Sequence, residues 1–92
     1  MYEHFRDRLK QRYELDITKD EYFDLCEAQS ITIIANSGKR KKIIIHFKNK
    51  LIYAVRQKKK GGLLVTALPM ENLPKLAEPL IQQYIKNIIK VQ

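Results

Sequence analysis

A histidine and two arginines repeat at intervals of four near the start of the chain. His4, Arg8 and Arg12 fall one helical turn apart, so they share one face of any helix formed by residues 4–13. Like charges at this spacing destabilise a helix by about 0.2–0.5 kcal/mol unless an anion lies on them. Histidine transfers protons near neutral pH, and arginine binds phosphate through paired hydrogen bonds. The stripe therefore predicts a phosphate site, with a solvated helix face as the simpler alternative.

Cleavage of RNA is the chemistry that these residue types fit. RNA carries its own nucleophile, the 2′-hydroxyl, so a protein has only to move protons and stabilise the charge on phosphorus. His4 is the candidate general acid or base, and Arg8 and Arg12 are the candidate phosphate clamps. Residues 28–70 contain no carboxylate for a hard cation, and one cysteine with two distant histidines does not make a zinc site. We therefore expect neither a metal nor a cofactor.

The charge of the chain is concentrated in its middle. The net charge is +8, yet the first 27 residues hold eight acids against five bases. Residues 28–70 hold ten lysines and arginines and no acid, which favours one basic surface for a polyanion. RNA is favoured over DNA, and a membrane is not expected because no basic amphipathic helix is present. The predicted nucleic-acid-binding residues are Lys39, Arg40, Lys41, Lys42, His46, Lys48, Arg56, Lys58, Lys59 and Lys60.

The elements that must position these residues can be read from hydrophobic periodicity. We predict helices over residues 2–14 and 18–29, the second opened by a capping box of Thr18 and Glu21. From residue 31 the period changes to two, and four short strands joined by short turns occupy residues 31–68. A last helix covers residues 73–91. The prediction is a single α+β domain, residues 1–92, whose antiparallel sheet has helices on one face.

The facing of the strands decides which polar side chains are open to a ligand. A three-residue loop over residues 48–50 places Ile43, Ile45 and Tyr53 beneath the helices. This register leaves His46 and Arg56 on the open face. The register of the last strand is left open by the loop over residues 58–62.

The C-terminal helix carries a broad apolar stripe. Its apolar residues spread over about 180° of the helix, whereas packing on one sheet needs about 100°. The surplus predicts a second contact, with another copy of the chain, with an inhibitory protein or with the first helix. The residues assigned to that contact are Ile81, Ile85, Ile88 and Ile89.

Taken together, these elements resemble a known class of proteins. The first helix reads H-x-x-x-R-x-x-x-R, a second helix and an antiparallel sheet follow, and the closing strand reads LVTALP. These features are similar to small phage and mobile-element proteins of the broad barnase/colicin-D/RelE-like class of ribonucleases and toxins. The resemblance spans residues 4–69 and implies that Thr66 belongs to the catalytic set with His4, Arg8 and Arg12. The C-terminal helix lies outside it.

The sequence thus predicts an RNA-binding protein of the small metal-independent ribonuclease or toxin-like type, encoded by a phage or mobile element. A noncatalytic nucleic-acid-binding module and a phage-type interaction protein that binds a host enzyme are the alternatives. Cys26 is the single cysteine, which is typical of a reduced, cytoplasmic protein. The charged start is not typical of a signal peptide, and no apolar run reaches transmembrane length.

Overall fold

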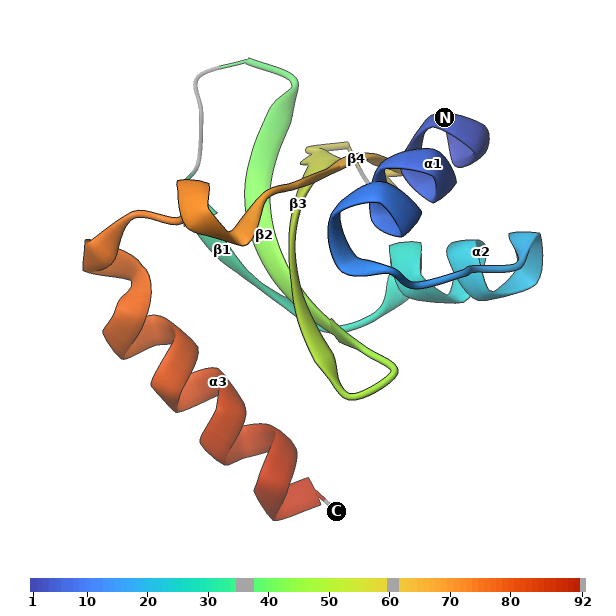
Figure 1. Cartoon of the computed structure of the whole chain (residues 1–92). Helices are drawn as coiled ribbons and strands as arrows, with labels where there is room; N and C mark the ends of the chain where they lie inside the picture. Colours follow the sequence, from blue (N-terminus) through green and yellow to red (C-terminus); the bar gives the residue numbers. More distant parts are fainter. Residues whose placement is uncertain (35–37, 60–61, 92) are drawn as a thin grey trace.

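The computed structural model describes residues 1–34, 38–59 and 62–91, without the side chains of residues 34 and 89–91. Lys60, one of the predicted nucleic-acid-binding residues, and the side chain of Ile89 lie outside this description. The described residues confirm the α+β class, with three α-helices and one four-stranded antiparallel sheet (Figure 1). The elements are α1 (Tyr2–Tyr13), α2 (Lys19–Glu27), β1 (Ser30–Ile34), β2 (Arg40–Phe47), β3 (Lys50–Gln57), β4 (Leu64–Leu68), the 3-10 turns η1 (Met70–Asn72) and η2 (Lys75–Ala77), and α3 (Glu78–Val91). No helix in this description is long and apolar enough to cross a membrane.

The start of α2 follows from its capping box. The Thr18 hydroxyl accepts a hydrogen bond from the Glu21 backbone N–H at 3.1 Å, and the Glu21 carboxylate accepts one from the Thr18 N–H at 2.9 Å. The hydrogen bond from the Thr18 backbone is the main cause that lowers the pKa of Glu21. Two helix N–H groups that would otherwise lack partners are thereby satisfied. The prediction that a capping box opens the second helix is confirmed.

The β2–β3 hairpin differs from the prediction by one residue. Phe47 pairs with Lys50, so the turn consists of Lys48 and Asn49 alone, both with positive φ (48° and 66°). The predicted three-residue loop is therefore wrong. Because side chains alternate along a strand, a shift of one residue moves every side chain of β3 to the other face.

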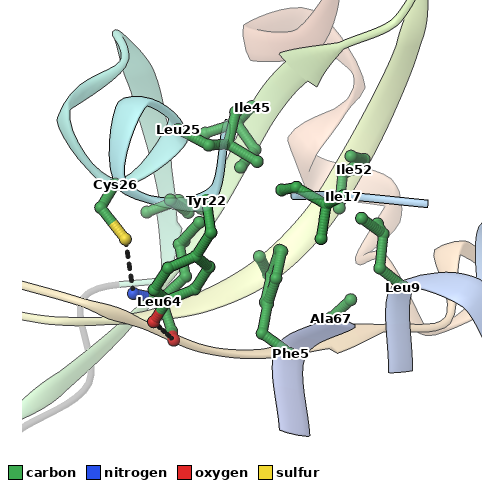
Figure 2. Close-up of a cluster of buried hydrophobic side chains, with 12 residues drawn as sticks. Phe5, Leu9, Ile17, Tyr22, Leu25, Cys26, Ile45, Ile52, Leu64 and Ala67 are labelled. Carbon is green, nitrogen blue, oxygen red and sulfur yellow. Dashed lines mark hydrogen bonds between the residues drawn. The ribbon is translucent and has the colours of Figure 1, made fainter. Parts of the chain in front are cut away.

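The corrected register gives the sheet two apolar faces. Ile43 and Ile45 share the first face with Ile52 and Ala54, and α1 and α2 cover it. Ile44 faces the opposite way, and α3 covers this second face (Figure 1). The prediction that all helices lie on one face is wrong, because β2 is apolar on both sides. Figure 2 shows the first cluster, which also contains Phe5, Leu9, Ile17, Tyr22, Leu25, Cys26, Leu64 and Ala67.

The apolar stripe of α3 is largely used by the second face of the sheet. Ile81 and Tyr84 are buried there, and Ile85 and Ile88 pack against the same cluster. The helix begins at Glu78 after two 3-10 turns, five residues later than predicted. Three of the four residues assigned to a partner, Ile81, Ile85 and Ile88, thus contact the chain's own sheet.

Three tyrosine hydroxyls hold the ends of strands in place. Tyr13 donates to the Leu68 carbonyl at 2.6 Å and accepts from the Tyr53 backbone N–H at 2.9 Å, so its hydroxyl bridges β3 and β4. Tyr22 donates to a β4 carbonyl at 2.6 Å, and Tyr84 donates to the carbonyl of residue 29 at 3.2 Å. Burial raises the pKa of these three tyrosines and of Tyr53.

Because of these tyrosines, we expect the protein to lose stability at high pH. Their folded-state pKa lies above the unfolded value of about 10, so their contribution is complete below that pH and declines as pH rises above it. The free energy of unfolding should fall by up to about 1.4 kcal/mol per pH unit for each tyrosine. Urea titrations between pH 8 and 11.5 measure how the free energy of unfolding changes with pH. Tyr84→Phe should remove the contribution of one tyrosine to this slope. A slope that Tyr84→Phe does not change would contradict the assignment.

Candidate nucleic-acid interface

The α1–β4 contact brings together two of the predicted catalytic residues. His4 Nε2 lies 3.1 Å from Thr66 Oγ1, although 62 residues separate them in the chain. A bulge in β4 helps to place the threonine: Thr66 pairs with Val55 and Leu64 pairs with Arg56, which leaves Val65 as an extra residue. The His4 side chain is exposed and Thr66 is partly buried, so an anion can approach the imidazole from solvent.

The two arginines of the stripe have different surroundings. Arg8 donates to the Gln11 side-chain oxygen at 2.8 Å on the surface of α1. Arg12 donates through Nη1 to the backbone carbonyl of Ala67 on β4. Arg12 therefore anchors the helix to the strand, and its remaining N–H groups are the part that a phosphate can use. Arg8 lies one turn from His4, and its described hydrogen bond goes to a side chain of the same helix.

Side chains from both N-terminal helices satisfy main-chain groups of β4. Besides Arg12 and Tyr13, the Tyr22 hydroxyl donates to the Leu64 carbonyl, and Cys26 Sγ accepts from the Leu64 N–H at 3.4 Å (Figure 2). An edge strand with such partners is protected from pairing with another chain. These contacts of Tyr13 and Tyr22 with β4 were not predicted from the sequence, although the need of a buried hydroxyl for a partner is a signal for them.

The clustered lysines gather at one end of the β2–β3 hairpin. Lys39 precedes β2, and residues 40–42 begin it. The Lys58 N–H donates to the Lys39 carbonyl at 2.8 Å, so the segments before β2 and after β3 lie side by side. A cavity of about 570 Å³ lies there, lined by Gly38, Lys39, Gln57, Lys58 and Lys59. The predicted residues Lys39, Arg40, Lys41, Lys42, Lys58 and Lys59 are thus brought together. We call this group the basic end.

Glycine is required where the chain returns from the basic end to β4. A Cβ atom added at Gly62 would lie 2.1 Å from the Gln57 carbonyl oxygen. The Gly62 N–H also donates to the Lys59 carbonyl at 2.9 Å. The close approach of two backbone segments thus keeps Lys59 beside the end of β3.

A row of cross-strand partners links the basic end to the histidine. Lys42 on β2 pairs with Val55 on β3, and Val55 pairs with Thr66 on β4. Neighbouring strands are about 4.8 Å apart, so the backbones of Lys42 and Thr66 lie about 10 Å apart across the sheet. The row therefore leads from the lysines to the contact between Thr66 and His4. A nucleic-acid strand that crosses the sheet at this end meets both.

Arg56 lies elsewhere than predicted. Its guanidinium donates to the Cys26 carbonyl, to the Ala28 carbonyl at 3.4 Å and to the Ser30 hydroxyl at 3.2 Å. It thereby caps the C-terminal end of α2, on the helix-covered first face. The prediction of an open-face position was wrong because of the one-residue error in the β2–β3 turn.

Lys48 and His46 also lie away from the basic end. Lys48 occupies the turn at the other end of the hairpin, where it donates to the Asp16 carbonyl at 2.9 Å and lies 3.5 Å from a Glu21 carboxylate oxygen. His46 is partly buried, and a hydrogen bond from its backbone opposes the effect of burial on the pKa of Tyr84. His46 therefore lies near α3, whereas Lys48 attaches the hairpin to the segment between α1 and α2.

The described side chains include no group of three His, Cys, Asp or Glu that could hold a metal ion. Comparisons of the chain with protein-family models, with curated proteins and with solved structures found no match. Function is therefore inferred below from the geometry of the site and from its chemistry.

Proposed function

We propose that this protein binds RNA through the basic end and the row that leads to His4. The observation that carries the proposal is that Lys39, Lys58 and Lys59 line one cavity, and that Arg40, Lys41 and Lys42 follow directly at the start of β2. The stretch of chain that supplies them contains no acid. Lysine and arginine contacts with phosphate supply most of the affinity in backbone-directed nucleic-acid binding.

The composition of the surrounding chain supports the same surface. Residues 28–70 contain no acid, so the like charges gathered there repel one another, and a polyanion relieves this repulsion. Strand pairing fixes Lys41 and Lys42 on a rigid element, while Lys39 and Lys59 border the cavity. This arrangement suits a ligand whose charges are spaced along a backbone.

Charge reversal at the cavity tests the proposal. The double variant Lys39→Glu/Lys59→Glu should bind a labelled RNA oligonucleotide roughly 10–100-fold more weakly at physiological salt, because phosphate contacts are lost and repulsion replaces them. The matched control is Lys19→Glu/Lys86→Glu, which changes the net charge equally at exposed residues of α2 and α3. Fluorescence anisotropy measures both affinities. Equal losses in the two double variants would show that net charge, and not this surface, determines binding.

A second candidate function, metal-independent RNA cleavage, is favoured by the contact between His4 and Thr66. In this reaction the 2′-oxygen forms a bond to phosphorus and the bond from phosphorus to the 5′-oxygen breaks. The 2′-hydroxyl loses a proton and the leaving 5′-oxygen gains one, which gives a cyclic phosphate and a free hydroxyl end. Thr66 orients the ring through Nε2, and Nδ1 is the atom left to exchange a proton with the substrate. Arg8 supplies positive charge near the phosphorus.

The His4→Ala variant separates cleavage from binding. We expect it to cut RNA about 10²–10⁴-fold more slowly than wild type, because proton transfer contributes only in the transition state. RNA affinity should change by no more than about threefold, since the lysines remain. The assay uses labelled RNA in EDTA, with both proteins purified identically. A His4→Ala protein that cuts RNA as fast as wild type would remove the catalytic proposal and leave the binding proposal intact.

A further inference from the structure

The two edge strands of the sheet, β1 and β4, differ in the hydrogen-bond partners of their main-chain groups. Side chains of α1 and α2 hydrogen-bond to main-chain groups of β4, as described above. For β1, at the other edge, the hydrogen bonds found in the described residues to main-chain groups of Ser30–Ile34 come from β2. The strand reads SITII, with four β-branched residues and no charge. An uncharged edge strand of this kind is suited to pair with another strand.

An apolar hollow lies next to this edge. It measures about 250 Å³ and is lined by Ile33, Pro74, Leu76, Ala77 and Leu80. Leu76, in η2, is 90% exposed, and Leu80, in the first turn of α3, is 49% exposed. Another apolar surface that covered these leucines and the hollow would remove them from water, which favours association.

We propose that a second copy of this chain covers β1 and the hollow. Antiparallel pairing of β1 with β1 of the second copy follows a twofold axis perpendicular to the sheet. This axis keeps α3 of both copies on the same face of a continuous eight-stranded sheet. Leu76 and Leu80 of each copy then lie on either side of the axis, where they can pack against each other. The strand edge and the leucines are thus buried by a single symmetric contact.

The charge distribution favours a second copy of the chain as the partner at this surface. In a chain of net charge +8, repulsion disfavours self-association through basic surfaces and so favours a surface that carries no net charge. Lys75 and Glu78, which flank the hollow in sequence, cancel each other, and β1 is uncharged. Antiparallel pairing also places the basic ends of the two copies at opposite ends of the paired strands, about 17 Å apart or more for five-residue strands. Repulsion between the basic ends is therefore reduced in this arrangement.

A bulge limits how much the strands themselves contribute. The register of β1 on β2 shifts between Thr32 and Ile34, so the regular edge is Ser30–Thr32. Pairing over so few residues supplies few hydrogen bonds. Burial of the leucines must therefore supply most of the free energy of association. Charge at Leu76 or Leu80 should therefore disrupt the dimer more than any change in β1.

Sedimentation of the full chain tests the surface. Wild type should form a dimer with increasing concentration between about 1 and 500 μM, the range that a modest interface reaches. Leu76→Glu and Leu80→Glu should shift dissociation at least tenfold toward monomer. The matched control is Phe23→Glu, because Phe23 is 46% exposed on α2 at the other side of the sheet. Monomer at every concentration, or a dimer that the leucine variants do not weaken, would overturn the proposal.

Disulfide trapping tests the strand pairing separately. Thr32 is exposed and central in β1, so the twofold axis brings the two copies of this residue close together. Thr32→Cys should form a disulfide-linked dimer under mild oxidation, because cysteines opposite one another on antiparallel strands meet the required separation. Lys19→Cys, exposed on α2, is the control, and Cys26 is buried in both proteins. Equal crosslinking of the two variants would contradict pairing through β1.

Discussion

Replacing Phe5 with alanine should lower the free energy of unfolding by about 3–5 kcal/mol. Phe5 is 0% exposed on α1 and packs in the first cluster, with its ring centroid 5.6 Å from that of Tyr22. Removal of the ring leaves a cavity between α1 and the sheet, and rigid strands cannot collapse to fill it. Because α1 carries His4 and Arg12, the same substitution should also release the helix from β4. Urea titration followed by circular dichroism measures the loss.

The control for this prediction is Phe23→Ala. Phe23 is the same residue type on the neighbouring helix, but half-exposed, so its substitution should change the free energy of unfolding by less than about 1 kcal/mol. A 92-residue domain has a total stability of about 5–15 kcal/mol, so Phe5→Ala should be partly unfolded at 37 °C. Equal losses for the two variants would show that α1 is not packed on the sheet as described.

The second large effect is expected at Arg56. Replacing it with methionine, which keeps much of the side-chain volume, should lower the free energy of unfolding by about 2–4 kcal/mol. The carbonyls of Cys26 and Ala28 and the hydroxyl of Ser30 then lose a charged donor at the end of α2. RNA affinity should remain within about twofold of wild type under conditions where the variant is folded, because Arg56 lies apart from the basic end.

Lys59→Met provides the matched comparison for Arg56→Met. Lys59 is an exposed cation beside the cavity, so its replacement should weaken RNA binding and leave the free energy of unfolding nearly unchanged. The two variants remove the same charge with opposite expected consequences. If Arg56→Met lost RNA affinity and kept its stability, Arg56 would belong to the binding surface and the corrected strand register would be wrong.

Much of the fold could be predicted because local signals agree with the tertiary structure. The capping box of Thr18 and Glu21 marks the start of α2, and the change of period near residue 31 marks the sheet. Short links between strands require antiparallel neighbours, which is the observed order β1-β2-β3-β4. These features depend on residues close in sequence, so a single chain is sufficient to identify them.

The facing of the strands could not be predicted in the same way. The β2–β3 turn uses Lys48 and Asn49 with positive φ, and lysine is an unusual residue in that conformation. Nothing in the local sequence requires two residues in place of three. The choice depends on α3 covering the second face, which is a contact between distant segments. Tyr53 and Arg56 were therefore placed on the wrong faces.

The candidate site, like the fold, could be predicted from the sequence only in part. The spacing of His4, Arg8 and Arg12 predicts that they share a helix face, and the resemblance of the closing strand pointed to Thr66, which lies beside His4. The partner of Arg12 is a backbone carbonyl of β4, and a carbonyl has no sequence signature. Contacts of this kind depend on how α1 packs on the sheet, so a pattern of residue types does not reveal them.

The salt dependence of RNA binding by the wild-type chain tests the central claim most directly. Six described cations form the basic end, so we expect the logarithm of the association constant to fall with the logarithm of salt concentration with a slope of about −3 to −5, at about 0.7–0.9 per phosphate contacted. Lys39→Glu/Lys59→Glu should reduce the magnitude of that slope by about 2, and Lys19→Glu/Lys86→Glu should leave it unchanged. An association constant that does not change between low and physiological salt, or no binding at low salt, would contradict RNA binding by the basic end.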